Sequence, residues 1–204
     1  MKNILVNYIN KNKTDLLIII VLFFIGIAIG IIFINNTEDI QKNDIRNYID
    51  NLICNAKNYA NIDKTQLLSI SVKNNLLFII IIWFLGCTII GGPIIYLAII
   101  YKGISIGYTI SALIAVLGVK TGTIITILAL ALQNIIYLPI VFVIAENGVK
   151  LYKGLYKRCI NIKEELIKHT IIMSASLVIT FLSSLVEVYC STNLLILFIS
   201  KVLV

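Results

Sequence analysis

Residues Leu16 to Ile34 form an apolar run of 19 residues that contains no charged side chain. As an α-helix this run is about 28 Å long, close to the roughly 30 Å hydrocarbon core of a bilayer. The apolar core of a signal peptide would be shorter, about 7–15 residues, and would end in a small-residue cleavage site. This run ends instead at Asn35-Asn36-Thr37. We therefore predict a retained membrane-spanning helix.

The whole chain has the composition of an integral membrane protein. Apolar residues make up 59% of it and charged residues 13%, against about 45–50% and about 25% in soluble domains. The net charge of +7 does not indicate nucleic-acid binding, because the basic residues lie between apolar blocks and not in one stripe with interleaved aromatics. The apolar blocks predict an all-α membrane domain with five transmembrane helices, at 16–34, 76–101, 104–119, 124–145 and 171–190.

The basic residues predict the side on which each connection lies. By the positive-inside rule, the N-terminus (1–15) and the basic segment 146–170 are cytoplasmic. Five crossings then place the polar segment 35–75 outside, together with an external or interfacial tail at 191–204. Lys102, which falls between the second and third predicted spans, is assigned to the cytoplasmic side.

Glycine patterns predict close packing between helices. The triplet Gly91-Gly92-Pro93 predicts a kink inside the second span, because Pro93 cannot donate a backbone hydrogen bond and its ring crowds the preceding turn. Small residues recur every four positions in the short third span, and Gly26 and Gly30 form a GxxxG pair in the first. We expect the second and third spans to meet closely, with these packing and kink residues: Gly86, Gly91, Gly92, Pro93, Gly103, Gly107 and Ser111.

The external segment contains an amphipathic helical pattern with one apolar face, because apolar residues recur there at spacings of three and four. Two interpretations remain open. The face could pack on the bilayer or on the spans, or it could bind a partner protein. The candidate partner face consists of Ile45, Tyr48, Ile49, Leu52, Ile53 and Tyr59.

Three polar residues fall within the predicted spans. Gln133 and Asn134 lie in the fourth, where amides are costly unless they are hydrogen-bonded, so we expect them to face other helices. Glu187 is the one carboxylate within an apolar block. It is either a proton or ligand site or a solvated residue near the outer interface.

Sequence motifs for catalysis are absent. The single histidine, His169, lies near Glu164 and Glu165 but not in an HExxH pattern. There is no GxSxG nucleophile motif and no glycine-rich loop for ATP. The four cysteines have neither CxxC nor Cys/His spacing. We therefore predict a protein that is not an enzyme, with no metal and no cofactor.

The arrangement of Asn74-Asn75 before a span, Gly86 within it, Gly-Gly-Pro, and then Tyr101-Lys102-Gly103-Ile104-Ser105-Ile106-Gly107 resembles the stage II sporulation protein M family. This resemblance implies a membrane scaffold that works with the peptidoglycan-degrading stage II sporulation proteins D and P at the sporulation septum and mother-cell membrane during engulfment of the forespore. The other partner is the lipid bilayer, and homo-oligomerisation stays open. The alternative is a transporter subunit whose site lies near the Gly-Gly-Pro kink and the amides of the fourth span.

Overall fold

The computed structural model describes residues 13–37, 43–47, 49, 51, 64–157 and 162–202. In this part of the chain every regular element is helical and there is no strand. Five helical stretches are long and apolar enough to cross a membrane, by length and composition: Thr14–Asn35, Lys64–Gly86, Gly91–Leu117, Gln133–Tyr156 and Lys163–Leu195. The all-α membrane fold with five spans is therefore confirmed.

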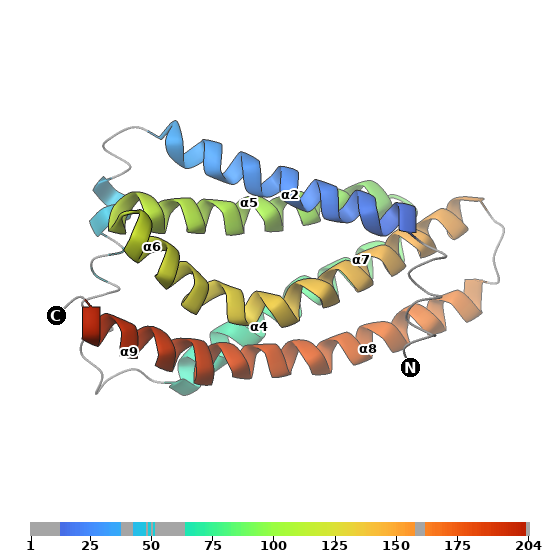
Figure 1. Ribbon diagram of the computed structural model, residues 1–204. Helices are drawn as coiled ribbons and strands as arrows, with labels where there is room; N and C mark the ends of the chain where they lie inside the picture. The colour runs from blue at the N-terminus through green and yellow to red at the C-terminus, as the bar shows by residue number, and fades with distance from the viewer. Residues whose placement is uncertain are drawn as a thin grey trace.

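The helices form an elongated bundle (Figure 1). Helix α2 (Lys13–Asn35) lies along α5 (Gly91–Leu117), and α4 (Lys64–Gly86) packs against α7 (Leu132–Lys157) and α8 (Ile162–Val186). Two long helical stretches each contain one π-helical turn. The first joins α6 (Val119–Thr126), η2 (Ile127–Ala131) and α7, and the second joins α8, η3 (Glu187–Ser191) and α9 (Thr192–Val202).

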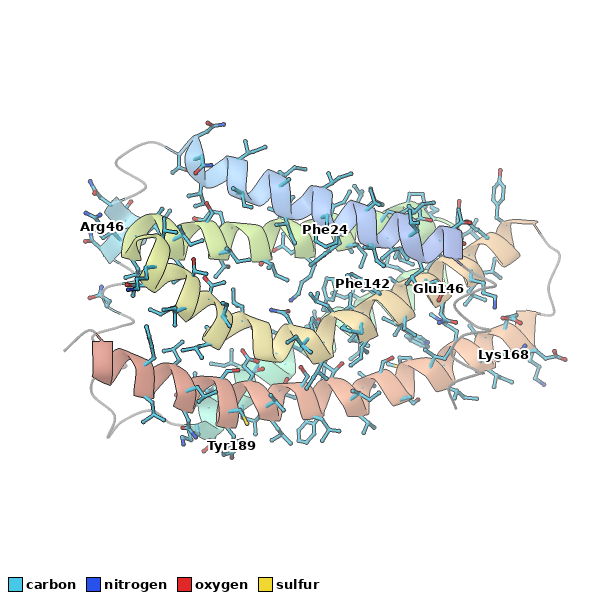
Figure 2. All side chains as sticks on the ribbon, viewed as in Figure 1. Phe24, Arg46, Phe142, Glu146, Lys168 and Tyr189 are labelled. Atoms are coloured by element: carbon cyan, nitrogen blue, oxygen red, sulfur yellow. The ribbon has the colours of Figure 1, made fainter. Side chains whose placement is uncertain are left out.

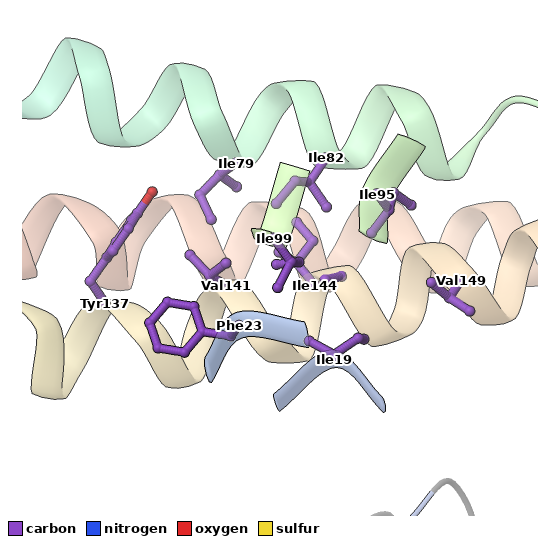
Figure 3. Close-up of a cluster of buried hydrophobic side chains, with 11 residues drawn as sticks. Ile19, Phe23, Ile79, Ile82, Ile95, Ile99, Tyr137, Val141, Ile144 and Val149 are labelled. Atoms are coloured by element: carbon purple, nitrogen blue, oxygen red, sulfur yellow. The ribbon is translucent and has the colours of Figure 1, made fainter. Parts of the chain in front are cut away.

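Helix α7 forms the centre of the bundle. In its most apolar window 56% of the residues are buried, against 17–28% in the other candidate spans. The apolar cluster around it contains side chains from four helices (Figure 3): Ile19 and Phe23 of α2, Ile79 and Ile82 of α4, Ile95 and Ile99 of α5, and Tyr137, Val141, Ile144, Ala145 and Val149 of α7. The outward faces carry apolar residues too, as lipid contact requires. Phe24 of α2, for example, is 63% exposed.

The predicted boundaries of the second and third spans are wrong. The second span is α4, which ends at Gly86, and the chain reverses at residues 87–90. The Gly-Gly-Pro triplet begins α5 and does not kink a helix at 76–101. Proline is tolerated in the first turn of a helix because its missing N–H would have no partner there. The third span consequently starts at Gly91, not at 104, and Lys102 lies in its middle instead of in a cytoplasmic loop.

Two other predicted breaks differ from the structure. The turn expected at 120–123 occurs at Gly118, whose φ of 79° is accessible to glycine but not to most residues. The break expected after residue 190 is the π-helical turn η3, through which the helix continues to Val202. Thr192 and Asn193 do not end the helix, because their side chains bond back to the carbonyls of Glu187 (3.2 Å) and Tyr189 (2.7 Å).

The predicted segment 146–170 is also mostly helical. α7 runs on to Lys157 and α8 begins at Ile162. Glu146, which was assigned to this cytoplasmic segment, is buried in α7 with 2% exposure. Arg46 and Lys168 lie at opposite ends of the bundle (Figure 2), so the two polar connections are separated by the length of the helices. Which end faces the cytoplasm stays a prediction from the charge pattern.

Candidate functional site

A polar cluster lies inside the bundle where the two π-helical turns meet. Gln133 follows η2 by two residues, and Glu187 is the first residue of η3. The side-chain amide Nε2 of Gln133 donates a hydrogen bond of 2.6 Å to Glu187 Oε2. The hydroxyl of Ser71, on α4, donates to the same carboxylate oxygen. Single π-helical turns occur frequently at functional sites, and here both turns bring polar side chains to one point.

Asn75 extends this cluster deeper into the bundle. Its Nδ2 lies 3.2 Å from the hydroxyl of Ser71 and 3.2 Å from the hydroxyl of Ser184 on α8. Its backbone carbonyl accepts a hydrogen bond of 3.5 Å from Tyr137 on α7. Asn75 is only 6% exposed, so these bonds satisfy an amide that would otherwise be costly to bury. They tie α4, α7 and α8 together.

Lys102 approaches the cluster from α5. Its ammonium lies 4.8 Å from the ring centroid of Tyr137 and 5.5 Å from that of Phe78. Contacts of this kind attract a cation to the ring face and contribute about 0.5–2 kcal/mol. An ionisable side chain in the middle of a span is costly, and such residues generally face the bundle interior or an aqueous cavity. Lys102 does both.

Lys102, Gln133 and Glu187 line one cavity of about 310 Å³. The remaining walls come from α4, from η3 and from the first residue of α9: Ser71, Asn74, Asn75, Leu67 and Ile70, then Val188, then Thr192. Ligand sites in proteins typically measure about 300–1,000 Å³ and combine apolar walls with a few placed polar groups. We define this as the Lys102–Glu187 cavity.

The structure brings two of the three predicted intramembrane polar residues together. Gln133 and Glu187 share a hydrogen bond, whereas the side chain of Asn134 bonds locally to the carbonyl of Leu130 at 2.8 Å and does not line the cavity. The sequence pattern did not identify Lys102, which was assigned to a loop, or Ser71 and Asn75, which were assigned to the external segment. The sequence does contain an indication of this site. Lys102 and Glu187 are isolated charged residues in apolar blocks, and such residues generally face the bundle interior near a group of opposite charge.

Gly103 and Gly107 of α5 pack on α2, the first span, and not on the second span as expected. A Cβ added at Gly103 would lie 3.1 Å from Gly26 Cα and would collide with the carbonyl oxygen of Phe23. A Cβ at Gly107 would lie 2.9 Å from Ile27 Cα. The contacts advance in the same direction along both helices, so α2 and α5 are parallel. Ser111, further along the same stripe, is buried as well.

The other predicted packing residues lie at the opposite end of α5 and at the end of α4. Gly86 faces Gly148 of α7, where an added Cβ would be 2.8 Å from Gly148 Cα and 2.8 Å from His169 Nε2. Gly91 and Gly92 are buried at the start of α5, with Gly92 against the ring of Tyr152, while Pro93 is exposed. His169 is itself buried, and its Nε2 lies 3.2 Å from the carbonyl oxygen of Trp83.

The external segment begins by packing on the bundle. Ile49 is 6% exposed and forms a cluster with Ile34 of α2 and Ala112 of α5, to which Ile45 adds. Ile49 is therefore buried against the spans and is not free for a partner. Of the two interpretations of the apolar face, packing on the spans applies to this residue. Tyr48, Leu52, Ile53 and Tyr59 lie outside the described residues.

Within the described part of the chain, no group of three or more His, Cys, Asp or Glu side chains is placed to hold a metal ion. Cys87, in the turn between α4 and α5, and Cys190, in η3, are free thiols. Burial raises the pKa of the Cys87 thiol, which makes it less reactive at neutral pH.

Comparison with protein families matches most of the chain. The family model described as stage II sporulation protein M matches residues 19–192, which includes the three middle spans, most of the first and fifth, and every residue that lines the Lys102–Glu187 cavity. No curated protein and no solved structure matches the chain.

Proposed function

Because the chain belongs to the stage II sporulation protein M family, we propose that it is a membrane scaffold without enzymatic activity that acts in endospore formation. In this proposal it recruits or anchors the peptidoglycan-degrading stage II sporulation proteins D and P at the septum while the mother-cell membrane engulfs the forespore. The observation that carries the proposal is the family match over residues 19–192.

The architecture supports a scaffold in two ways. A bundle with a well-packed apolar centre on α7 gives a rigid anchor. Helix α2 ends at Asn35, at the end of the bundle that the charge pattern assigns to the outside, where septal peptidoglycan lies, and the polar segment follows it. Ile45 and Ile49 hold the first part of that segment on α2 and α5, so its position relative to the membrane is fixed.

We assign partner binding to the remaining apolar and aromatic residues of the segment, Tyr48, Leu52, Ile53 and Tyr59. Aromatic and large apolar residues supply most of the binding energy at protein interfaces. In the sporulating bacterium that encodes this chain, its deletion should block engulfment and mislocalise fluorescent fusions of proteins D and P. Normal localisation of both fusions in the deletion strain would contradict the proposal.

A variant in which Tyr48, Leu52 and Tyr59 are all alanine tests the assigned face. We expect normal membrane levels of this variant but loss of both hydrolases from the septum. The matched control is Phe24→Ala, which removes an aromatic side chain from the exposed face of α2. The control should localise both hydrolases as the wild type does. If the triple variant also does so, the partner face lies elsewhere.

The Lys102–Glu187 cavity favours a second candidate, a transporter subunit. A polar cavity within the spans that contains Gln133 is what this alternative requires. Asn134 does not contribute to the cavity, and the Gly-Gly-Pro triplet opens a helix instead of breaking one. A transporter subunit of this kind would purify with an ATPase and without proteins D and P.

A further inference from the structure

The two charged groups of the Lys102–Glu187 cavity face the same space without direct contact. No ion pair joins them, and within the described residues the Lys102 ammonium has ring faces beside it but no hydrogen-bond acceptor. On the other side, Ser71 and Gln133 both donate to Glu187 Oε2. The second carboxylate oxygen, Oε1, accepts no hydrogen bond from the described residues. The cavity is therefore lined by a cationic donor and an anionic acceptor, and within the described residues neither the Lys102 ammonium nor Glu187 Oε1 has a hydrogen-bond partner.

A zwitterionic ligand matches both groups. An anionic oxygen would accept from Lys102, and an ammonium would donate to Glu187 Oε1. Hydrogen bonds between charged groups are shorter and about twice as strong as neutral ones. A zwitterion would pair with both groups, whereas a ligand with one charge would pair with only one of them.

The size and depth of the cavity fit a phospholipid headgroup. Its volume of about 310 Å³ corresponds to about ten water molecules at roughly 30 Å³ each. Ser71 lies seven residues from the start of α4, which is about 10 Å along the helix. The start itself is polar, because Lys64 of α4 bonds to Asn193 of α9 at 3.0 Å. The carboxylate of Glu187, which Ser71 contacts, thus lies about 10 Å along α4 from its polar first turn.

Access from the bilayer is lateral. Leu67 and Ile70 form part of the cavity wall and are 38% and 51% exposed on the outer face of α4. A headgroup could enter beside them while its acyl chains stay in the lipid. We propose that the Lys102–Glu187 cavity binds a zwitterionic ethanolamine phosphate group, as in phosphatidylethanolamine. This binding site goes beyond the scaffold role and does not depend on it.

The test is lipid binding to the full-length protein in detergent, measured by native mass spectrometry with phosphatidylethanolamine, phosphatidylcholine or phosphatidylglycerol. We expect phosphatidylethanolamine to bind at least about tenfold more tightly than the other two. The choline group has no N–H to donate to Glu187, phosphatidylglycerol has no cation, and a hydrogen bond to a charged group contributes enough for a tenfold difference. Lys102→Met and Glu187→Gln should each weaken phosphatidylethanolamine binding by at least about tenfold.

Matched controls separate the cavity from general charge effects. Lys73→Met removes a lysine from the exposed face of the same helix as Ser71, and Glu164→Gln removes a carboxylate from α8 outside the cavity. Both should bind phosphatidylethanolamine as the wild type does. If a single cavity variant fails to fold, K102M/E187Q removes both charges together and leaves neither uncompensated. It should remain folded by size-exclusion chromatography and still lose the lipid.

Soluble glycerophosphoethanolamine identifies the source of the ligand. If it displaces phosphatidylethanolamine, the site takes the free headgroup; if it does not, the site takes the membrane lipid, and either result supports the assigned chemistry. Equal binding of the three lipids would overturn the proposal, as would retention of phosphatidylethanolamine by K102M/E187Q. Absence of any bound lipid would also overturn the proposal, because the cavity would then hold water only.

Discussion

The parallel packing of α2 on α5 predicts a strong effect of adding a side chain at Gly103. An added Cβ would lie 3.1 Å from Gly26 Cα, below the 3.4 Å at which ordinary van der Waals contact begins. Alanine therefore requires the helices to separate by about 0.3 Å at this point, and by more where the Cβ meets the carbonyl oxygen of Phe23. Overpacking of this kind typically costs about 1–3 kcal/mol. Leucine adds three further carbons and should cost more.

The assay is thermal unfolding of the purified protein in detergent, followed by size-exclusion chromatography. We expect Gly103→Ala to unfold at a lower temperature than the wild type and Gly103→Leu to be lower again. The control is Ser105→Leu, which places the same side chain on the exposed face of α5 and should behave as the wild type. If Gly103→Leu were as stable as Ser105→Leu, the close approach of α2 and α5 would be wrong.

Three further perturbations test other parts of the structure. Gly118→Ala should destabilise the protein by about 1–3 kcal/mol in the same unfolding assay, because φ of 79° and ψ of 163° are accessible essentially only to glycine; an unchanged unfolding temperature would place the turn elsewhere. Lys153→Gln removes the exposed 2.5 Å ion pair with Asp15 and should cost less than about 1 kcal/mol, so a larger loss would mean that this pair is shielded from solvent. In a cysteine-free background, Arg46→Cys should react with a membrane-impermeant thiol reagent added to intact cells and Lys168→Cys should not, and the reverse pattern would invert the predicted topology.

The long apolar runs were sufficient to predict the class of fold. Runs such as Leu16–Ile34 can be buried only in lipid or in a bundle within it, and five of them were identified. Their boundaries were harder to predict, because Gly91-Gly92-Pro93 is compatible both with a kink and with a helix start. The predicted third span has only 16 residues, which is short for a bilayer and indicates that its predicted start is too late. Placing the reversal at 87–90 gives helices of 23 and 27 residues instead.

The candidate site could be predicted only in part, because its residues are far apart in the sequence. Gln133 and Glu187 were recognisable as polar residues in apolar blocks. Lys102 has the local pattern of a short loop, and its counterpart Glu187 is 85 positions away. Ser71 and Asn75 precede the apolar part of α4, so their place inside the bundle follows only from the packing of α4 against α8.

Affinity purification of the tagged chain from sporulating cells tests the proposed function most directly. We predict that the stage II sporulation proteins D and P are recovered with the wild-type chain and with Phe24→Ala, and that both are lost from the variant with alanine at Tyr48, Leu52 and Tyr59. Recovery of an ATPase in the absence of both hydrolases would contradict the scaffold role and favour a transporter subunit.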